Sequence, residues 1–130
     1  MSSVFTKIIN GEIPCYKIAE NEHCFAFLDI SPLAKGHTLV ITKKEIDYIF
    51  NVDDDLLAEL TVFAKKVAKA VEKAIPCKRI GVAVIGIEVP HTHIHLVPLN
   101  HVGDLDFSKP KMKPTLEELK EVQEAICGYL

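Results

Sequence analysis

The sequence predicts an α+β fold, in which a five-stranded antiparallel sheet packs against one long helix and a second helix lies near the C-terminus. Three observations favour this class. Segments with strand-like composition stand before and after one long stretch with helical periodicity. Strands and helices do not alternate as they do in a parallel, doubly wound sheet. The chain has 130 residues, which suits a single domain with a substantial core.

Short elements and turns are expected in the first third of the chain. Apolar residues with helical spacing predict one short helical turn at 4–9. The NGEIP sequence at 10–14 predicts a turn, because asparagine and glycine tolerate positive φ and proline cannot continue a helix. Two strands are expected at 15–21 and 23–30, joined by a hairpin turn. A third strand is expected at 37–43, which is rich in β-branched residues.

A long amphipathic helix is predicted between Asn51 and Pro76. Apolar residues recur through this stretch at 3.6-residue spacing, and Pro76 cannot continue the helix. We expect Asn51 to cap the first turn, and the acidic residues 53–55 to complement the positive end of the helix dipole. A metal site at this acidic run is an alternative, but the dipole accounts for it without one.

Two further strands are expected at 79–89 and 91–99, close enough in sequence to pair as a hairpin. Thr115 and Glu118 form a capping box that predicts a final helix.

A basic, proline-containing segment at 109–113 stands between the last strand and the final helix. Its prolines exclude a helix, and we interpret it as a solvated, stiffened connector. The alternative is that its lysines reach a functional site.

The composition excludes several classes of protein. Apolar residues make up 48% of the chain and charged residues 25%, which is typical of an ordered globular protein. A net charge of −3 argues against a nucleic-acid-binding surface, although it does not exclude a mononucleotide ligand. The first residues lack the features of a secretory signal, and no apolar run is long enough to span a membrane. The four cysteines form no CxxC pair, so we expect reduced thiols and a cytoplasmic location.

Three of the six histidines stand at alternate positions in the sequence PHTHIHLVP, residues 90–98. On a strand, alternate side chains point to the same face, so His91, His93 and His95 are expected to form one row. The residues between them are threonine, isoleucine and leucine, which can pack against a core. The pattern therefore predicts a rigid strand that presents imidazoles on one face.

Three interpretations of this row are open. A purely structural role requires each imidazole to find a hydrogen-bond partner or water. A metal site is possible for two neighbouring histidines, with a third ligand such as His37 or Asp29, since the end pair is too far apart to share one ion. In the third interpretation His93 is a nucleophile towards phosphorus, flanked by imidazoles that orient it or donate hydrogen bonds.

The chain resembles the histidine triad family, whose signature is His-x-His-x-His followed by two apolar residues. The segments VFTKIINGEIP and FAFLDISPLAKGHTLVITKKE are similar to the N-terminal half of the family in order and spacing. The resemblance covers about residues 4–99. We therefore expect one domain over 1–130, with its core at 4–99 and a C-terminal extension at 100–130. The family fold implies a homodimer whose two sheets are joined.

The resemblance also implies a chemistry and a site. Family members cleave at the α-phosphorus of nucleoside phosphoramidates, adenylates or dinucleoside polyphosphates through a nucleotidyl intermediate on the middle histidine. That residue matches His93, with His91, His95 and His37 around it. Asp29 matches the ribose-binding acid, since its carboxylate can accept hydrogen bonds from both ribose hydroxyls. The remaining positions that match the nucleotide pocket are apolar: Phe5, Ile8, Phe27, Leu28, Ile30 and Leu39.

These matches predict a nucleotide hydrolase or transferase acting on purine nucleoside phosphoramidates or related conjugates. The alternatives are a dinucleoside polyphosphate hydrolase and a catalytically weak nucleotide-binding regulator. No phosphate-binding GxxxxGK loop is present, and we expect neither a metal nor a cofactor.

The chain departs from the family pattern at three places, one of which is the short hairpin at 79–88, which lacks the usual asparagine and glycine-rich turn. Ile87 and Glu88 precede the triad where many members have a glutamine and a small hydroxyl residue, which bears on rate and leaving-group preference. Ser3 and Thr6 stand where some members have zinc-binding cysteines, so no structural zinc is expected.

Overall fold

The computed structural model describes residues 2–130 and contains five strands, three α-helices and two short 3-10 helices. In chain order these elements are α1 (Val4–Ile9), β1 (Lys17–Glu20), β2 (Cys24–Leu28), β3 (Thr38–Thr42), η1 (Ile49–Asn51), α2 (Asp54–Ala74), β4 (Arg79–Ala83), β5 (His93–Leu99), η2 (Val102–Asp104) and α3 (Leu116–Cys127).

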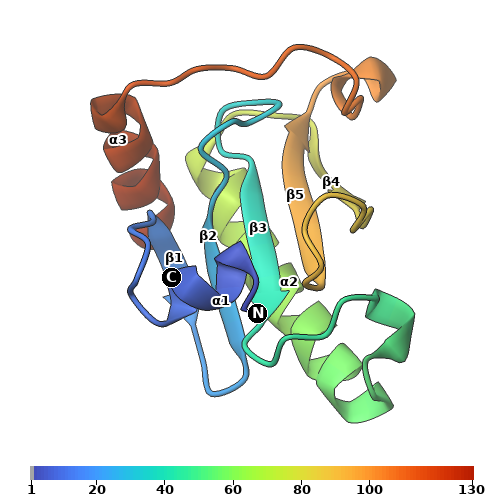
Figure 1. The fold of residues 1–130 in the computed structure, drawn as a ribbon. Coiled ribbons are helices and arrows are strands. Elements are labelled where there is room, and N and C mark those ends of the chain that lie inside the picture. The colour runs from blue at the N-terminus through green and yellow to red at the C-terminus, as the bar shows by residue number, and fades with distance from the viewer. Residues whose placement is uncertain (1) are drawn as a thin grey trace.

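The five strands form one antiparallel sheet in the order β1-β2-β3-β5-β4, which confirms the predicted fold class (Figure 1). The histidine-bearing strand β5 lies between β3 and β4, away from both edges. Its register with β3 pairs Ile41 with His93 and Leu39 with His95. A strand held on both sides cannot easily shift, so its side chains have fixed positions.

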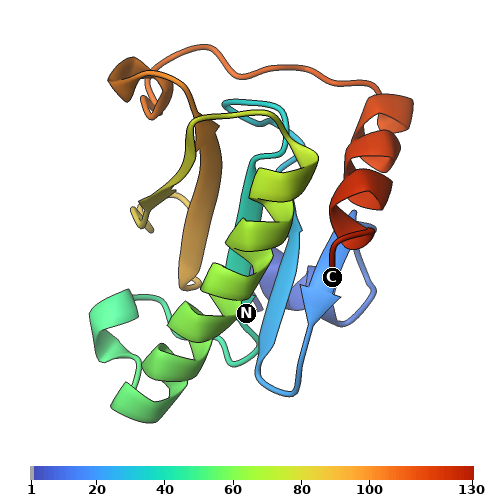
Figure 2. The same ribbon diagram turned by 180° about the vertical axis from the view of Figure 1, so that it is seen from behind.

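The two faces of the sheet bury different sets of residues. On one face, alternate residues of β2, β3 and β5 pack against α2, and α3 also contributes to this larger core (Figure 2). The other face carries a smaller aromatic and aliphatic cluster, which α1 covers with Phe5 (Figure 1). Because side chains alternate along a strand, the histidines at 93 and 95 point to the α1 face, while Ile94 and Leu96 join the larger core.

The long helix begins two residues later than the sequence predicts. Asn51 does not cap it, because Asn51 closes the 3-10 helix η1. Asp53 is the N-cap instead, and its Oδ1 accepts a hydrogen bond of 2.9 Å from the Leu56 backbone N–H. A carboxylate at this position satisfies a free N–H and meets the positive end of the helix dipole.

The strands β4 and β5 are shorter than predicted where they approach each other. β4 ends at Ala83 and β5 begins at His93, so the residues between them form a loop. Thr92 is drawn away from the ladder because its backbone N–H and its hydroxyl both donate to the carbonyl of Ile46, at 2.6 Å each. The first histidine of the row, His91, therefore precedes the strand.

The end of the chain follows the sequence prediction. Thr115 and Glu118 form the expected capping box at the start of α3. Before α3, a longer segment at 105–114, which contains the basic residues 109–113 and is called the connector from here on, runs from η2 over one end of the sheet (Figure 1). In the part of the chain that the structure describes, no helix combines the length and apolarity needed to cross a membrane. All four cysteines are free thiols.

Candidate active site

Four of the histidines come together on the α1 face of the sheet. His93 and His95 project from β5, His91 lies just before that strand, and His37 lies just before β3. All four are buried. The ring centroids of His93 and His95 are 4.9 Å apart, and those of His95 and His37 are 5.2 Å apart. The structure therefore brings together the four residues that the sequence singles out.

The backbone fixes the proton on the His93 ring. Nδ1 of His93 lies 2.6 Å from the carbonyl oxygen of His91. A carbonyl can only accept a hydrogen bond, so Nδ1 carries the proton and donates it. In the neutral ring Nε2 then holds a free lone pair. An imidazole held in this tautomer is available as a nucleophile.

A second hydrogen-bond chain fixes the opposite tautomer on His37 and His95. The Leu33 backbone N–H donates to Nδ1 of His37 at 3.0 Å, so the proton of neutral His37 is on Nε2. That Nε2–H donates in turn to Nδ1 of His95, also at 3.0 Å. The proton of His95 is therefore on its own Nε2. This hydrogen-bond chain therefore places a donor, the Nε2–H of His95, on the ring next to His93, whose own Nε2 is unprotonated.

Burial keeps this pair of rings uncharged. It lowers the pKa of His37 to about 3 and that of His95 to about 4, in each case assisted by the charge of a neighbouring histidine. Moving a charged imidazole out of water costs more free energy than its interactions with neighbouring groups restore, so burial favours the neutral form. Both rings are consequently neutral at physiological pH, as the hydrogen-bond chain requires.

His91 is held by a network that begins at the first helix. Its Nε2–H donates to the carbonyl of Thr42 at 2.6 Å, and its Nδ1 accepts from the Ser3 hydroxyl at 2.7 Å. Glu45 accepts from the Ser3 backbone N–H at 2.6 Å and from the Thr6 hydroxyl at 2.7 Å. The network fixes His91 in place, and the carbonyl of His91 in turn orients His93. Both nitrogens of the His91 ring are therefore engaged within the protein.

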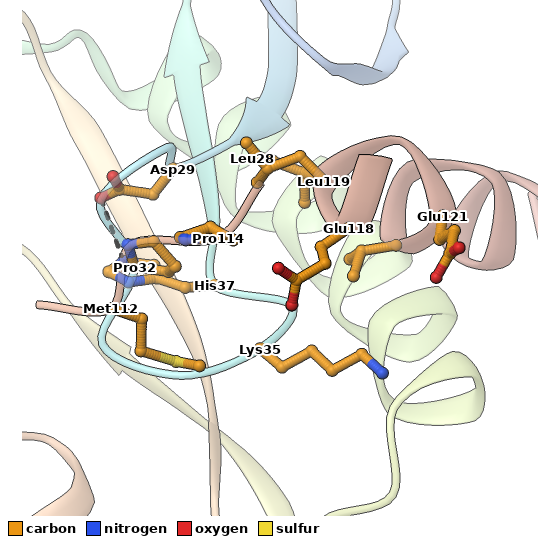
Figure 3. Close-up of a pocket in the computed structure, with 12 residues that line it drawn as sticks. Leu28, Asp29, Pro32, Lys35, His37, Met112, Pro114, Glu118, Leu119 and Glu121 are labelled. Atoms are coloured by element: carbon orange, nitrogen blue, oxygen red, sulfur yellow. Dashed lines mark ion pairs between the residues drawn. The ribbon is translucent and has the colours of Figure 1, made fainter. Parts of the chain in front are cut away.

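Asp29 lies beside this site, at the end of β2. One carboxylate oxygen, Oδ1, accepts a hydrogen bond of 2.8 Å from the Ser31 backbone N–H and so caps the turn that follows. The other, Oδ2, lies 3.7 Å from Nε2 of His37 (Figure 3). Because His37 is neutral and the distance is long, this contact is not an effective ion pair. Oδ2 thus stays available to accept from a ligand. Burial raises the pKa of Asp29, while the hydrogen bond from Ser31 opposes that shift.

An apolar wall stands next to the histidines. The Phe5 ring packs edge-on against both Phe27 and His93, with centroid distances of 5.4 and 5.0 Å. Leu39 belongs to the same cluster, and Ile8 packs against it. Two other residues expected in the nucleotide pocket do not belong to this cluster: Leu28 points to the larger core on the other face, and Ile30 is 63% exposed beside Asp29.

A cavity of about 400 Å³ opens on this face and is lined by Phe5, Asp29, Leu39, His93, His95 and the β4–β5 loop from Ile85 to Val89. Its lining also includes Phe107 and Lys111 from the connector. The sequence prediction did not name Phe107, whereas the position of Lys111 agrees with the alternative that lysines of the 109–113 segment reach the site. The Phe107 ring stands 4.7 Å from that of His95, centroid to centroid. The single aromatic residue of this segment, just before its basic, proline-containing part, is the signal that could have indicated this contact.

A second, smaller cavity lies behind Asp29 and His37, between the 29–37 loop and α3 (Figure 3). Its volume is about 140 Å³, and Leu28, Met112, Glu118 and Leu119 are among the residues that line it. It faces the larger core and does not include His93 or His95.

Asp29, His37 and His95 could in principle hold a metal, since one ligand atom from each lies within 4.8 Å of the others. The hydrogen-bond pattern opposes this use of His37. Its Nδ1 already accepts from Leu33, so Nε2 must carry the proton, and a protonated nitrogen cannot bind a metal. A metal would have to remove that proton or break the bond from Leu33. The donor set therefore fits a hydrogen-bond chain better than a metal centre.

The fold and the site together define an α+β protein with a row of buried imidazoles, linked by hydrogen bonds, at a candidate active site. Comparison with known proteins agrees. The family model described as HIT domain matches residues 10–102, and the chain belongs to this histidine triad (HIT) family.

Two relatives match almost the whole chain. An uncharacterised HIT-like protein of Methanocaldococcus jannaschii is 41% identical over 133 residues, covering 92% of this chain and 98% of its own. The adenosine 5′-monophosphoramidase of Schizosaccharomyces pombe is 36% identical over 133 residues, covering 100% of this chain and 99% of its own. The crystal structure of a Hit-like protein involved in cell-cycle regulation from Bartonella henselae is 31% identical. It superimposes with a TM-score of 0.86 over 99% of this chain and 97% of that one.

Proposed function

We propose that this protein is a nucleoside phosphoramidase that cleaves at the α-phosphorus of purine nucleoside phosphoramidates through a covalent intermediate on His93. The observation that carries the proposal is the 2.6 Å hydrogen bond from Nδ1 of His93 to the His91 carbonyl, which leaves Nε2 free on a residue lining the cavity. The S. pombe relative, an adenosine 5′-monophosphoramidase, supports the substrate class.

The reaction follows from the tautomers. Nε2 of His93 attacks the α-phosphorus, the P–N bond to the leaving group breaks, and the amine departs after taking up a proton. Water then attacks the nucleotidyl-histidine, breaks its P–N bond and releases the nucleoside monophosphate with His93 restored. His95 presents its Nε2–H as a donor to a phosphoryl oxygen, which stabilises the charge that develops as the bonds change. His37 acts by holding His95 in that tautomer.

The nucleoside is bound by the adjoining surface. Oδ2 of Asp29 accepts from the ribose hydroxyls, since Oδ1 is already engaged by Ser31. Phe5, Phe27 and Leu39 supply an apolar wall for the base, which accepts a purine without requiring one particular edge. The exposed Ile30 side chain lies next to Asp29 in the chain and can close over a bound nucleoside.

We also propose a homodimer in a reducing, cytoplasmic compartment. The edge strand β4 and the loop after it expose Val82, Val84, Ile85 and Ile87, an apolar border that joining of two sheets would cover. The free thiols fit a compartment in which cysteines stay reduced.

The test is AMP release from adenosine 5′-monophosphoramidate. The wild-type protein is expected to turn over, and His93→Ala is expected to lose activity by about 1,000-fold or more, as removal of an enzyme nucleophile does. His23→Ala is the matched control, since His23 is an exposed histidine at the β1–β2 turn. Wild-type protein that binds AMP but releases none would identify a nucleotide-binding regulator instead. Faster turnover of a diadenosine polyphosphate than of the phosphoramidate would favour the hydrolase alternative.

A further inference from the structure

The histidine cavity presents little positive charge to a phosphate. His37 and His95 are neutral, because burial lowers their pKa values to about 3 and about 4. Two acidic residues, Asp29 and Glu88, line the same cavity. A nucleotide phosphate would therefore meet hydrogen-bond donors, but also carboxylates that repel it. A cation is the missing component.

The connector at 105–114 lies against the site on the side of β5. Phe107 packs edge-on against His95 at 4.7 Å and against His37 at 6.2 Å. Five residues later, the Met112 backbone N–H donates to the carbonyl of Pro32 at 2.9 Å, which ties the connector to the loop that carries His37. The segment between these two anchors is thus held close to the cavity, and Lys111 lies within it.

Lys111 is placed where the cation is needed. It lines the same cavity as His93 and His95, and its ammonium group donates to the carbonyls of Phe107 at 2.6 Å and Lys109 at 3.2 Å. An ammonium group has three donors, so these two bonds hold it in place and leave one donor for a ligand.

The neighbouring lysines are directed elsewhere. Lys109 donates to the carbonyl of Gly103 at 2.7 Å, in the turn η2. Lys35 lines the second cavity, not the one with the histidines. Within residues 2–130, Lys111 is the lysine that lines the histidine cavity, and no arginine lines it.

We propose that Lys111 binds the α-phosphoryl group of the nucleotide, and that Phe107 holds the connector in the position that makes this possible. The inference rests on the proposed nucleotide-binding function and assigns to the connector the charge recognition that neutral imidazoles cannot supply. It predicts a site in which the charge of Lys111 adds to the hydrogen bond from His95 in distinguishing a nucleotide from a nucleoside.

The test compares AMP with adenosine by isothermal titration calorimetry. In Lys111→Met, affinity for AMP is expected to fall about tenfold, the lower end of the range for a hydrogen bond to a charged group, because the lysine is partly screened by water. Affinity for adenosine is expected to stay within twofold of wild type. The AMP deficit should shrink as salt is raised, since screening weakens the wild-type interaction.

Two variants sharpen the comparison. Lys109→Met removes a lysine two residues away that points to η2, and it should bind AMP as wild type does. Lys111→Arg keeps the charge and should recover most of the affinity. The proposal is overturned if Lys111→Met binds AMP as tightly as wild type, if its affinities for AMP and adenosine fall equally, or if wild type itself binds AMP no tighter than adenosine.

These binding measurements do not depend on catalytic turnover. A wild-type protein without phosphoramidase activity would therefore refute the proposed reaction, while the two affinities still decide the role of Lys111.

Discussion

At the scale of single residues, the site is defined by which nitrogen of each of its four imidazole rings carries the proton. The backbone carbonyls of His91 and Thr42 can only accept, and the Leu33 backbone N–H can only donate, so they assign the tautomers of the rings that they contact. Three rings carry the proton on Nε2, and His93 alone carries it on Nδ1. One of four neighbouring imidazoles thus presents an unprotonated Nε2, although all four side chains are chemically identical in the sequence.

Burial of neutral histidines makes stability depend on pH. Their folded pKa values, about 3 for His37 and about 4 for His95, lie below the usual value near 6.5 of an unfolded chain. The unfolded state therefore binds more protons as pH falls below about 6.5, and stability that is fully present above that pH is lost towards pH 4. We expect each ring to contribute a loss on the order of 2 kcal/mol between pH 7 and pH 5.

Urea denaturation at a series of pH values measures this loss. His37→Asn should give a shallower fall in unfolding free energy between pH 7 and pH 5, whatever its stability at pH 7. An unchanged slope in that variant, or a wild-type slope near zero, would show that the ring takes up its proton in the folded state. The pKa of His23 shifts in the opposite direction, because a hydrogen bond to Glu59 raises it. His23 is exposed, so water screens this interaction.

At the scale of elements, the loop between β2 and β3 positions half of the site. Asp29 begins it and His37 ends it, and its path depends on Gly36 at φ +92°. A Cβ at this glycine would lie 2.8 Å from Cγ1 of Ile75, just beyond the C-terminus of α2. The loop is therefore fixed both by a backbone conformation that favours glycine and by close packing against the helix layer.

Gly36→Ala is expected to be more damaging than Gly11→Ala, which serves as its matched control. Gly11 also has positive φ, at +80°, but a Cβ there would meet nothing within 4 Å. The control should lose about 1 kcal/mol from backbone strain alone. Gly36→Ala should lose at least about 1 kcal/mol more, because Ile75 must move, and its kcat should fall as His37 is displaced. Equal unfolding free energies for the two variants would contradict this account of the loop.

The elements also show which kinds of sequence signal were sufficient. Strand-like composition bounded by turn residues predicted the sheet, and helical periodicity predicted α2, because both signals are local in the sequence. The start of α2 was predicted too early. Asn51 and Asp53 are both good N-cap residues, but Asn51 belongs to the 3-10 helix η1, so Asp53 caps α2. The predicted start of β5 was early because the partner of Thr92 is Ile46, far away in the sequence.

In the site, too, local sequence patterns indicated some features, while others depend on contacts with distant residues. The three-histidine pattern and His37 were recognisable from the sequence, but their tautomers were not, because the partners that set them lie in other elements. The packing of Phe107 against His95 was also missed. A phenylalanine in this segment was a signal, but the side chain that it meets depends on the path of a connector without regular structure.

At the scale of the whole molecule, one sheet edge exposes apolar residues and the other is covered by a helix. α3 packs beside β1, where Gln123 donates to the carbonyl of Lys17 at 2.9 Å. At the opposite edge, β4 carries Val82, which is 61% exposed although it pairs with the fully buried Leu96. An apolar residue exposed on an edge strand favours joining of two copies.

We expect the protein to sediment as a dimer, with β4 at the interface. Val82→Arg should shift it to a monomer, because the charge cannot be buried against a second apolar edge. Val62→Arg is the control, since Val62 is also exposed but lies on α2, in a groove with Ala19 and Leu130. Analytical ultracentrifugation measures both. A monomeric wild type, or a Val82→Arg variant that stays dimeric, would remove β4 from the interface.

The central claim is that a reversed tautomer makes one of four buried imidazoles the nucleophile. Long-range ¹H–¹⁵N correlation spectra of ¹⁵N-labelled protein at neutral pH report directly which nitrogen of each ring is protonated. We predict that His93 shows a protonated Nδ1 and an unprotonated Nε2, while His37, His91 and His95 show the reverse. A His93 ring with its proton on Nε2 would have no lone pair to offer phosphorus, and that result would contradict the account.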